Sequence, residues 1–247
     1  MTTLIVGASG ATGRQLVEQL LKKEQRLKLI VRSIDNLPES WKNNDSVTII
    51  QASVLNIGGD YMAKQLNDCQ SVALCLGHNI NFKGIYGQPR RLVLDTVNNI
   101  CIAIKKNAPN KPVKFVLMNT TGNQNRDLNE SISISQKVVL GLIRLLLPPH
   151  VDNEKAADYL RTMIGQKNKY IEWVAVRPDN LINEDKVTKY EEYPSPIRSA
   201  IFDAGTTSRI NVANFMSELI TDNKLWNKWK GQMPVIYNTS AQLKMDK

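Results

Sequence analysis

Hydrophobic residues in this chain alternate between short apolar runs and longer stretches with helical spacing. Short apolar runs bounded by turn residues are typical of strands buried in a parallel sheet. Such runs are found at residues 4–6, 27–31, 47–51, 71–76, 113–118, 171–176 and 235–237. Between them, apolar stripes predict helices after residue 13 and at residues 58–68, 88–106, 152–164 and 212–220. Strands that alternate with helices predict an α/β fold with a mainly parallel sheet.

Residues 131–147 are the most unusual segment, because isoleucine, valine and leucine occupy nearly every side of the helix that they predict. Gly141 and Arg144 interrupt the stretch, and two prolines followed by His150 end it. A helix that is apolar on all sides is typically buried, or covered by a contact between subunits. The alternative is a lid over an apolar substrate, and the sequence leaves these interpretations open.

The first predicted strand leads into a turn with three glycines at a three-residue spacing, Gly7, Gly10 and Gly13. The first glycine permits a tight turn, the second lets a pyrophosphate approach the backbone, and the third lets the helix pack on the strand. The free amides at the start of the helix then face an anion. An amphipathic helix and a second apolar strand complete the unit. We therefore predict a dinucleotide-binding, Rossmann-type doubly wound sheet with helices on both faces.

The residue after the second predicted strand distinguishes between two dinucleotides. NAD-binding chains usually offer Asp or Glu to the ribose hydroxyls here, whereas this chain has Arg32. A cation accommodates the 2′-phosphate of NADP, which a carboxylate would repel. The alternative is a solvated charge at a strand end. The pattern favours NADP as the cofactor, with NAD less favoured.

Further candidate residues follow the fourth and fifth predicted strands, because open parallel sheets bind ligands outside the carboxyl ends of their strands. Gly77 would let the dinucleotide backbone pass closely, and His78 either contacts the cofactor or caps its loop. Thr120 offers a hydroxyl where a bound nicotinamide would lie. His150 is a candidate acid near the same place, the alternative being a histidine in a solvent-facing loop.

Length and composition indicate one domain. The 247 residues can bury a full core, and neither a repeat nor a low-complexity linker divides them. We predict a single domain over residues 1–247, in which residues 178–247 contribute a lobe on the substrate side. Three cysteines, Cys69, Cys75 and Cys101, lie in apolar surroundings and are expected to be reduced. With two histidines besides, we expect no metal site.

The net charge of +9 would suit an acidic partner, but the basic residues are scattered and are not interleaved with aromatic residues. We therefore expect a phosphate site and no specific nucleic-acid binding. The longest apolar stretch, residues 138–147, is much shorter than the roughly twenty residues that span a bilayer. The chain begins directly with its first strand, so we expect no secretory signal and a cytoplasmic location.

The motifs follow a recognisable order along residues 1–237, with Gly77, Thr120 and Arg177 each near the end of a predicted strand after the glycine turn. In this order the chain resembles the short-chain dehydrogenase/reductase superfamily. More narrowly, it resembles the atypical branch that includes NmrA-like proteins, biliverdin reductase B and bacterial NADH-flavin reductases. The resemblance implies a single NAD(P)-binding Rossmann domain.

The resemblance also implies which residues hold the cofactor. Those that would bind the dinucleotide are Gly7, Ser9, Gly10, Ala11, Thr12, Gly13 and Arg32. Gly77, His78 and Asn119 would lie nearer the nicotinamide. Ser53 stands where many members have an aspartate beside the adenine, and Lys155 takes the place of the lysine in the superfamily's catalytic motif.

The chain departs from the superfamily at that motif, Tyr-x-x-x-Lys, in which Tyr passes the proton and Lys lowers its pKa. None of the seven tyrosines has a lysine four residues later, and Val151 stands at that spacing before Lys155. A conventional alcohol dehydrogenase or sugar epimerase is therefore not expected.

Two functions fit this combination. The first is an NADPH-dependent reductase that passes hydride to a flavin, a quinone or a similar conjugated small molecule, with Thr120 and His150 as catalytic residues. Such acceptors delocalise the incoming charge and depend less on a dedicated tyrosine acid. The alternative is a non-catalytic NADP-binding redox sensor or scaffold that acts through a protein partner, as NmrA-like proteins do. Residues 131–147 would then form a contact, either with that partner or between copies of the chain in a homo-oligomer.

Overall fold

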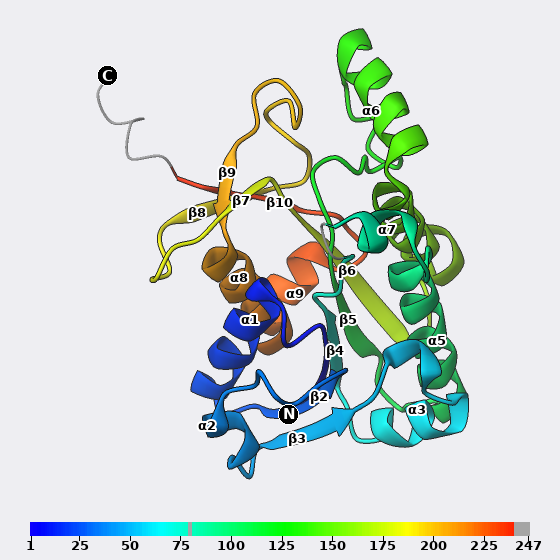
Figure 1. Cartoon of the computed structure of the whole chain (residues 1–247), viewed down its shortest axis with the longest axis vertical. Coiled ribbons are helices and arrows are strands. Elements are labelled where there is room, and N and C mark those ends of the chain that lie inside the picture. The colour runs from blue at the N-terminus through cyan, green and yellow to red at the C-terminus, as the bar shows by residue number, and fades with distance from the viewer. Residues whose placement is uncertain (79–80, 240–247) are drawn as a thin grey trace.

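The computed structural model describes residues 1–78 and 81–239. Within this part of the chain, eight strands form one sheet in the order β3-β2-β1-β4-β5-β6-β10-β8 (Figure 1). Neighbouring strands are parallel, except that β8 runs antiparallel to β10. The strands are β1 (Thr2–Val6), β2 (Arg26–Val31), β3 (Val47–Gln51), β4 (Ser71–Leu74), β5 (Val113–Met118), β6 (Ile171–Pro178), β8 (Tyr190–Tyr193) and β10 (Val235–Asn238).

The strand order confirms the doubly wound fold. From β1 the chain adds β2 and β3 on one side, and then returns to place β4, β5 and β6 on the other. Ligands of such sheets bind at the crevice where the order reverses, outside the carboxyl ends of the strands. The crevice lies here beside the ends of β1 and β4, which are paired from Thr3 to Val6 with Ser71 to Leu74.

Helices cover both faces of the sheet (Figure 1). One face packs against α1 (Ala11–Lys22), α8 (Arg209–Thr221), α9 (Asn223–Trp229) and the short α2 (Glu39–Lys42). The other packs against α3 (Gly59–Leu66), α5 (Leu92–Asn107) and α7 (Pro148–Tyr159), which continues as a π-helical turn over Leu160–Ile164. None of the helices in the described residues is long and apolar enough to cross a membrane.

Several short elements follow from no periodic pattern. They are the 3-10 turn η1 (Val54–Asn56), α4 (Phe82–Tyr86) and the strands β7 (Asn180–Ile182) and β9 (Thr206–Ser208), which pair in a separate two-stranded sheet. β7 and β9 span three residues each, which is too short for an alternation of apolar and polar positions to be recognised. These strands and β8 lie within the predicted substrate-side lobe; residues 240–247 of that lobe lie outside the described residues.

The predicted helix over residues 88–106 begins later than expected, at Leu92, because a distant carboxylate caps it. Asp152 of α7 accepts hydrogen bonds from the backbone amides of Val93 and Leu94, at 2.8 and 3.0 Å. The helix predicted at residue 152 begins earlier, at Pro148, since proline is well suited to the first helical turn.

The apolar segment 131–147 forms α6 (Ile134–Leu146), which stands out from the rest of the molecule (Figure 1). Only Gln136 and Leu140 of this helix are buried. The interpretation of the segment as a buried helix is therefore wrong. Ser133 caps the helix by accepting a hydrogen bond from the amide of Gln136, which sets its beginning.

Candidate functional site

Five strand ends bring the candidate residues to one edge of the sheet. Gly7 follows β1, Arg32 follows β2, Gly77 lies beyond β4, Thr120 beyond β5, and Asp179 follows β6. The strands are parallel neighbours, so their carboxyl ends share this edge.

The glycine turn has a geometry that only glycine permits at two of its positions. Gly7 has a positive φ of 85°, and a Cβ there would lie 2.6 Å from the carbonyl carbon of Cys75. A Cβ at Gly13 would lie 2.1 Å from the carbonyl oxygen of Gly7. Gly10 is the N-cap residue of α1 and has no side chain with which to cap the helix. The first-turn amides of α1 are therefore left to an anion from outside, as a bound pyrophosphate requires.

A cavity of about 380 Å³, here called the glycine-turn cavity, lies along this turn. It reaches from the turn across the ends of β2, β3 and β4. Of the predicted cofactor residues, it is lined by Gly7, Ser9, Arg32, Ser53, Gly77 and His78. Gly10 and Ala11 are exposed at the start of α1, whereas Thr12 and Gly13 are buried in its first turn.

Arg14 also belongs to this region, although the sequence analysis assigned it no role. Its Nε donates a hydrogen bond to the carbonyl oxygen of Ser9, at 3.1 Å, and its guanidinium donates to the carbonyl oxygen of Asn36. The side chain therefore joins the glycine turn to the loop that follows Arg32. The sequence could have indicated this role, because Arg14 directly follows the last glycine of the turn.

A second cavity, of about 620 Å³, lies under α6 and is here called the α6 cavity. Its polar side chains include Thr120, His150, Asn153 and Asp179. Apolar residues from α4, α6 and the loop before β9 form the rest of its wall, among them Ile85, Leu140, Ile143, Leu147 and Ile201. Gly77 and His78 line both cavities, so a ligand in one can reach the other past the end of β4.

His78 is held in place by Asp152 of α7, the same aspartate that caps α5. Its Nε2 lies 2.7 Å from Oδ2 of Asp152, a side chain that is almost completely buried. Asp152 thus joins the end of β4 to the start of α5 through α7. This contact orients the imidazole where the two cavities meet and identifies the partner of His78, which the sequence left undetermined.

Thr120 lines the α6 cavity, and its neighbour Asn119 does not reach it. Asn119 is buried and donates a hydrogen bond from Nδ2 to the carbonyl oxygen of Asn153, at 2.9 Å, while its Oδ1 accepts one from the amide of Thr120, at 2.8 Å. Its role in the structure is to attach the end of β5 to α7. The amide of Gly122 donates to Oγ1 of Thr120, at 3.3 Å, which orients the hydroxyl.

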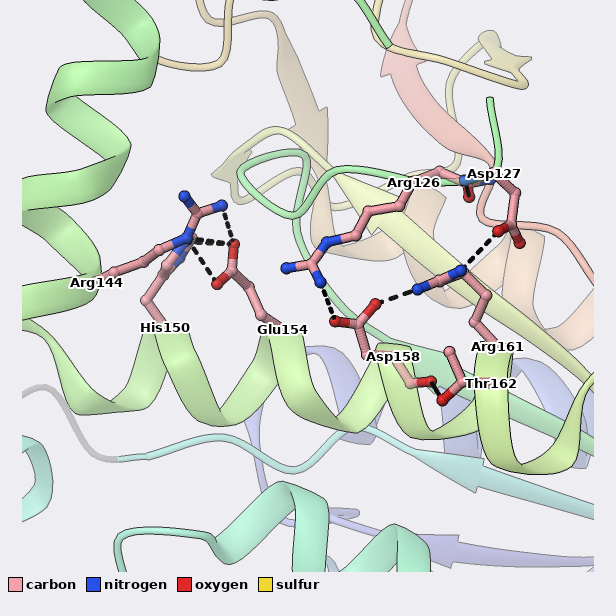
Figure 2. Close-up of polar contacts among 9 residues, drawn as sticks. Arg126, Asp127, Arg144, His150, Glu154, Asp158, Arg161 and Thr162 are labelled. Atoms are coloured by element: carbon pink, nitrogen blue, oxygen red, sulfur yellow. Dashed lines mark hydrogen bonds and ion pairs between the residues drawn. The ribbon is translucent and has the colours of Figure 1, made fainter. Parts of the chain in front are cut away.

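Figure 2 shows Arg144 and His150 both reaching the Glu154 carboxylate from the same side. Arg144 of α6 makes a bidentate contact with Glu154 of α7, with its Nε 2.9 Å from Oε2 and its Nη2 2.8 Å from Oε1. The Nε2 atom of His150 lies 3.4 Å from Oε1. Burial alone would raise the pKa of Glu154, but His150 and Arg144 outweigh it and lower that pKa to about 2. Glu154 is therefore ionised at neutral pH beside His150.

The same helix is tied to the loop after β5 by a second group of ion pairs (Figure 2). Arg126 lies 3.2 Å from Asp158, and Arg161 contacts both Asp158, at 3.3 Å, and Asp127, at 2.6 Å. The loop that carries Thr120 into the α6 cavity is thereby attached to α7 at both ends.

Asp179 is a carboxylate of the α6 cavity that the sequence analysis did not single out. It accepts hydrogen bonds from Oγ1 of Thr121, at 3.0 Å, and from the amide of Gly205, at 2.8 Å. Burial raises the pKa of this carboxyl group. These contacts join the end of β6 to the segment before β9 at the wall of the cavity. The sequence could have indicated Asp179 as a candidate, because it closely follows a predicted strand.

The structure does not bring Lys155 to the other candidates. It is exposed on α7, and the side chains that this helix contributes to the α6 cavity are those of His150 and Asn153. Among the described residues, no group of three His, Cys, Asp or Glu side chains could hold a metal ion.

Comparison with protein families gives a match to the NAD(P)H-binding family over residues 7–223. The match begins at the glycine turn and ends at the start of α9. An uncharacterized chloroplastic protein of Arabidopsis thaliana is 34% identical over 71 residues, which are 29% of this chain and 25% of that protein. The chain therefore matches only a quarter of the length of this relative.

Solved structures share the fold over nearly the whole chain. A short-chain dehydrogenase/reductase of Veillonella parvula, determined in complex with NADP, has a TM-score of 0.70 at 15% identity, covering 97% of this chain and 95% of that one. An oxidoreductase of Lactococcus lactis has a TM-score of 0.68 at 17% identity, covering 97% and 92%. An anaerobillin reductase of Escherichia coli O157:H7 has a TM-score of 0.68 at 14% identity, covering both chains completely.

Proposed function

Because this chain belongs to the NAD(P)H-binding family, we propose that it is an NADPH-dependent reductase that passes hydride to a flavin, a quinone or a similar conjugated small molecule. The observation that carries the proposal is the junction of the two cavities at Gly77 and His78. A dinucleotide along the glycine turn would end at this junction, beside an apolar cavity large enough for a small conjugated acceptor.

Each part of the dinucleotide has residues suited to it. The open amides at the start of α1 would bind the pyrophosphate, and Arg32 would contact the 2′-phosphate. Gly77 would allow close passage toward the α6 cavity, where Thr120 would position the nicotinamide or the acceptor. When bound, NADPH supplies a hydride to the acceptor.

The reduced acceptor also takes up one proton, for which His150 is the proposed donor. No tyrosine is found among the described residues that line either cavity. His150 lines the α6 cavity with an ionised carboxylate, that of Glu154, 3.4 Å from its Nε2 atom. This arrangement supports an imidazole in place of the tyrosine acid of conventional short-chain dehydrogenases.

The proposed reaction is tested by mixing the purified protein with NADPH and a panel of flavins and quinones, and following NADPH absorbance. We expect NADPH consumption with at least one acceptor. Thr120→Ala is expected to lower turnover about tenfold or more with unchanged cofactor affinity, because the positioning hydroxyl is lost. Thr120→Ser, which keeps the hydroxyl, is the matched control and should retain most of the activity.

Two results would contradict these assignments. Full turnover by Thr120→Ala would remove that residue from the mechanism. Tight NADPH binding without consumption across the panel would instead support the sensor or scaffold function, which the missing Tyr-x-x-x-Lys motif and the exposed α6 also suit.

The preference for NADP over NAD is tested at Arg32, which is exposed at the wall of the glycine-turn cavity. Arg32→Gln is expected to weaken NADPH binding about tenfold, since a charge-assisted contact to the 2′-phosphate is lost, and to leave NADH binding unchanged. Arg26→Gln, at the opposite end of β2, removes the same charge and is the control. Equal affinities for NADPH in Arg32→Gln and the unmodified protein would rule out this contact.

The proposed site of action is the cytoplasm. Cys69, Cys75 and Cys101 are free thiols, and burial raises the pKa of each to about 12. Unpaired, unreactive core cysteines support a reducing compartment.

A further inference from the structure

We propose that the outer face of α6 is a docking surface for an anionic membrane surface. The helix has two apolar faces that point in different directions. At about 100° per residue, one face carries Leu140, Ile143 and Leu147, which line the α6 cavity. The other face, here called the outer stripe, consists of Ile134, Val138, Leu142, Leu145 and Leu146, and every one of these side chains is exposed.

The outer stripe is too apolar to be an ordinary solvated helix face. Ile134 is 81% exposed and Leu145 is 78% exposed, and the described residues cover neither. Single exposed apolar residues are common, but a continuous stripe over three helical turns marks an interaction surface. Figure 1 shows this helix standing out from the other elements.

Charge favours a lipid surface with anionic headgroups as the occupant. Residues 131–151 contain no Asp or Glu, and the cation among them that is exposed to solvent is Lys137, since Arg144 is paired with Glu154. The short helix α4, which lines the same cavity through Ile85, carries Lys83 and an 81% exposed Phe82, and residues 82–94 also have no carboxylate. Apolar side chains with interspersed cations are the pattern by which helices lie in the interface of anionic membranes.

The ion pair between Arg144 and Glu154 gives the helix a fixed attachment. Arg144 points toward α7 and the outer stripe points away from it, so docking would not break this contact. A helix that is already held in place loses less conformational entropy on binding than a flexible segment would. Because the other face of α6 lines the α6 cavity, docking would also bring that cavity close to the membrane surface.

The test is flotation of the purified full-length protein with vesicles, without cofactor, so that the result is independent of the proposed reductase activity. The vesicles contain either phosphatidylcholine with phosphatidylglycerol or phosphatidylcholine alone. We expect the protein to float with the anionic vesicles and much less with the neutral ones. The double variant Val138→Glu with Leu145→Glu is expected to reduce the bound fraction about tenfold or more.

The matched control is Ile102→Glu with Met163→Glu, which adds the same two charges at apolar positions outside α6 that are 54% and 66% exposed, and it should float as the unmodified protein does. Thermal unfolding of each variant is the check that it is folded. The proposal is overturned if the unmodified protein floats with neither vesicle, or if the double variant floats equally well. A dimer in light scattering that the double variant converts to a monomer, without flotation, would instead identify the stripe as a contact between copies of the chain.

Discussion

Gly13→Ala is expected to weaken NADPH binding by about two orders of magnitude and to destabilise the protein. The added Cβ would lie 2.1 Å from the carbonyl oxygen of Gly7 and 3.0 Å from Cα of Ala8, so α1 must move away from the turn. Displacing backbone costs about 1–3 kcal/mol in the free energy of unfolding, and misplaced amides weaken binding by about 100-fold. Cofactor titration and urea unfolding measure the two effects.

Gly141→Ala is the matched control, because Gly141 is also a helical glycine and a Cβ there would meet nothing within 4 Å. We expect this variant to bind NADPH normally and to be more stable by about 0.5–1 kcal/mol, since alanine is the better helix former. If Gly13→Ala kept normal affinity, the close packing of α1 on the glycine turn would have no part in cofactor binding.

The second large effect is expected at Arg177, a completely buried arginine at the end of β6. Its guanidinium makes a bidentate contact with Glu130, at 2.6 and 2.9 Å, and donates to the carbonyl oxygens of Asn123, Pro194 and Met233. Arg177→Met is expected to lower the free energy of unfolding by about 3–5 kcal/mol, because it leaves the buried Glu130 carboxylate without its partner. Urea unfolding measures this loss.

Arg198→Met provides the control, since Arg198 pairs with Asp203 on the exposed surface. Its unfolding midpoint should equal that of the unmodified protein, as exposed ion pairs contribute little. A second variant, Glu130→Gln combined with Arg177→Met, should recover part of the lost stability, because no unpaired charge remains buried. An Arg177→Met variant as stable as the unmodified protein would show that the pair is not needed to hold these loops.

The sequence by itself determined the features that depend on neighbouring residues. Short apolar runs and apolar stripes with helical spacing predicted the α/β class and the doubly wound sheet. A strand that is buried on both faces is apolar along its whole length, and this can be seen in the local sequence. The spacing of Gly7, Gly10 and Gly13 predicted the turn, since its geometry excludes a Cβ at defined positions. The NAD(P)H-binding family match confirms the class of cofactor that this turn indicated.

The tertiary structure alone decided the contacts that join distant parts of the chain. His78 and Asp152 are 74 residues apart, and Arg177 and Glu130 are 47 apart. No local pattern encodes such pairs, because the partner is set by which strand and helix become neighbours. The direction of α6 is a further case. Its sequence is apolar on nearly all sides, so periodicity could not show which side would line a cavity and which would remain exposed; the attachment of Arg144 to Glu154 decides it.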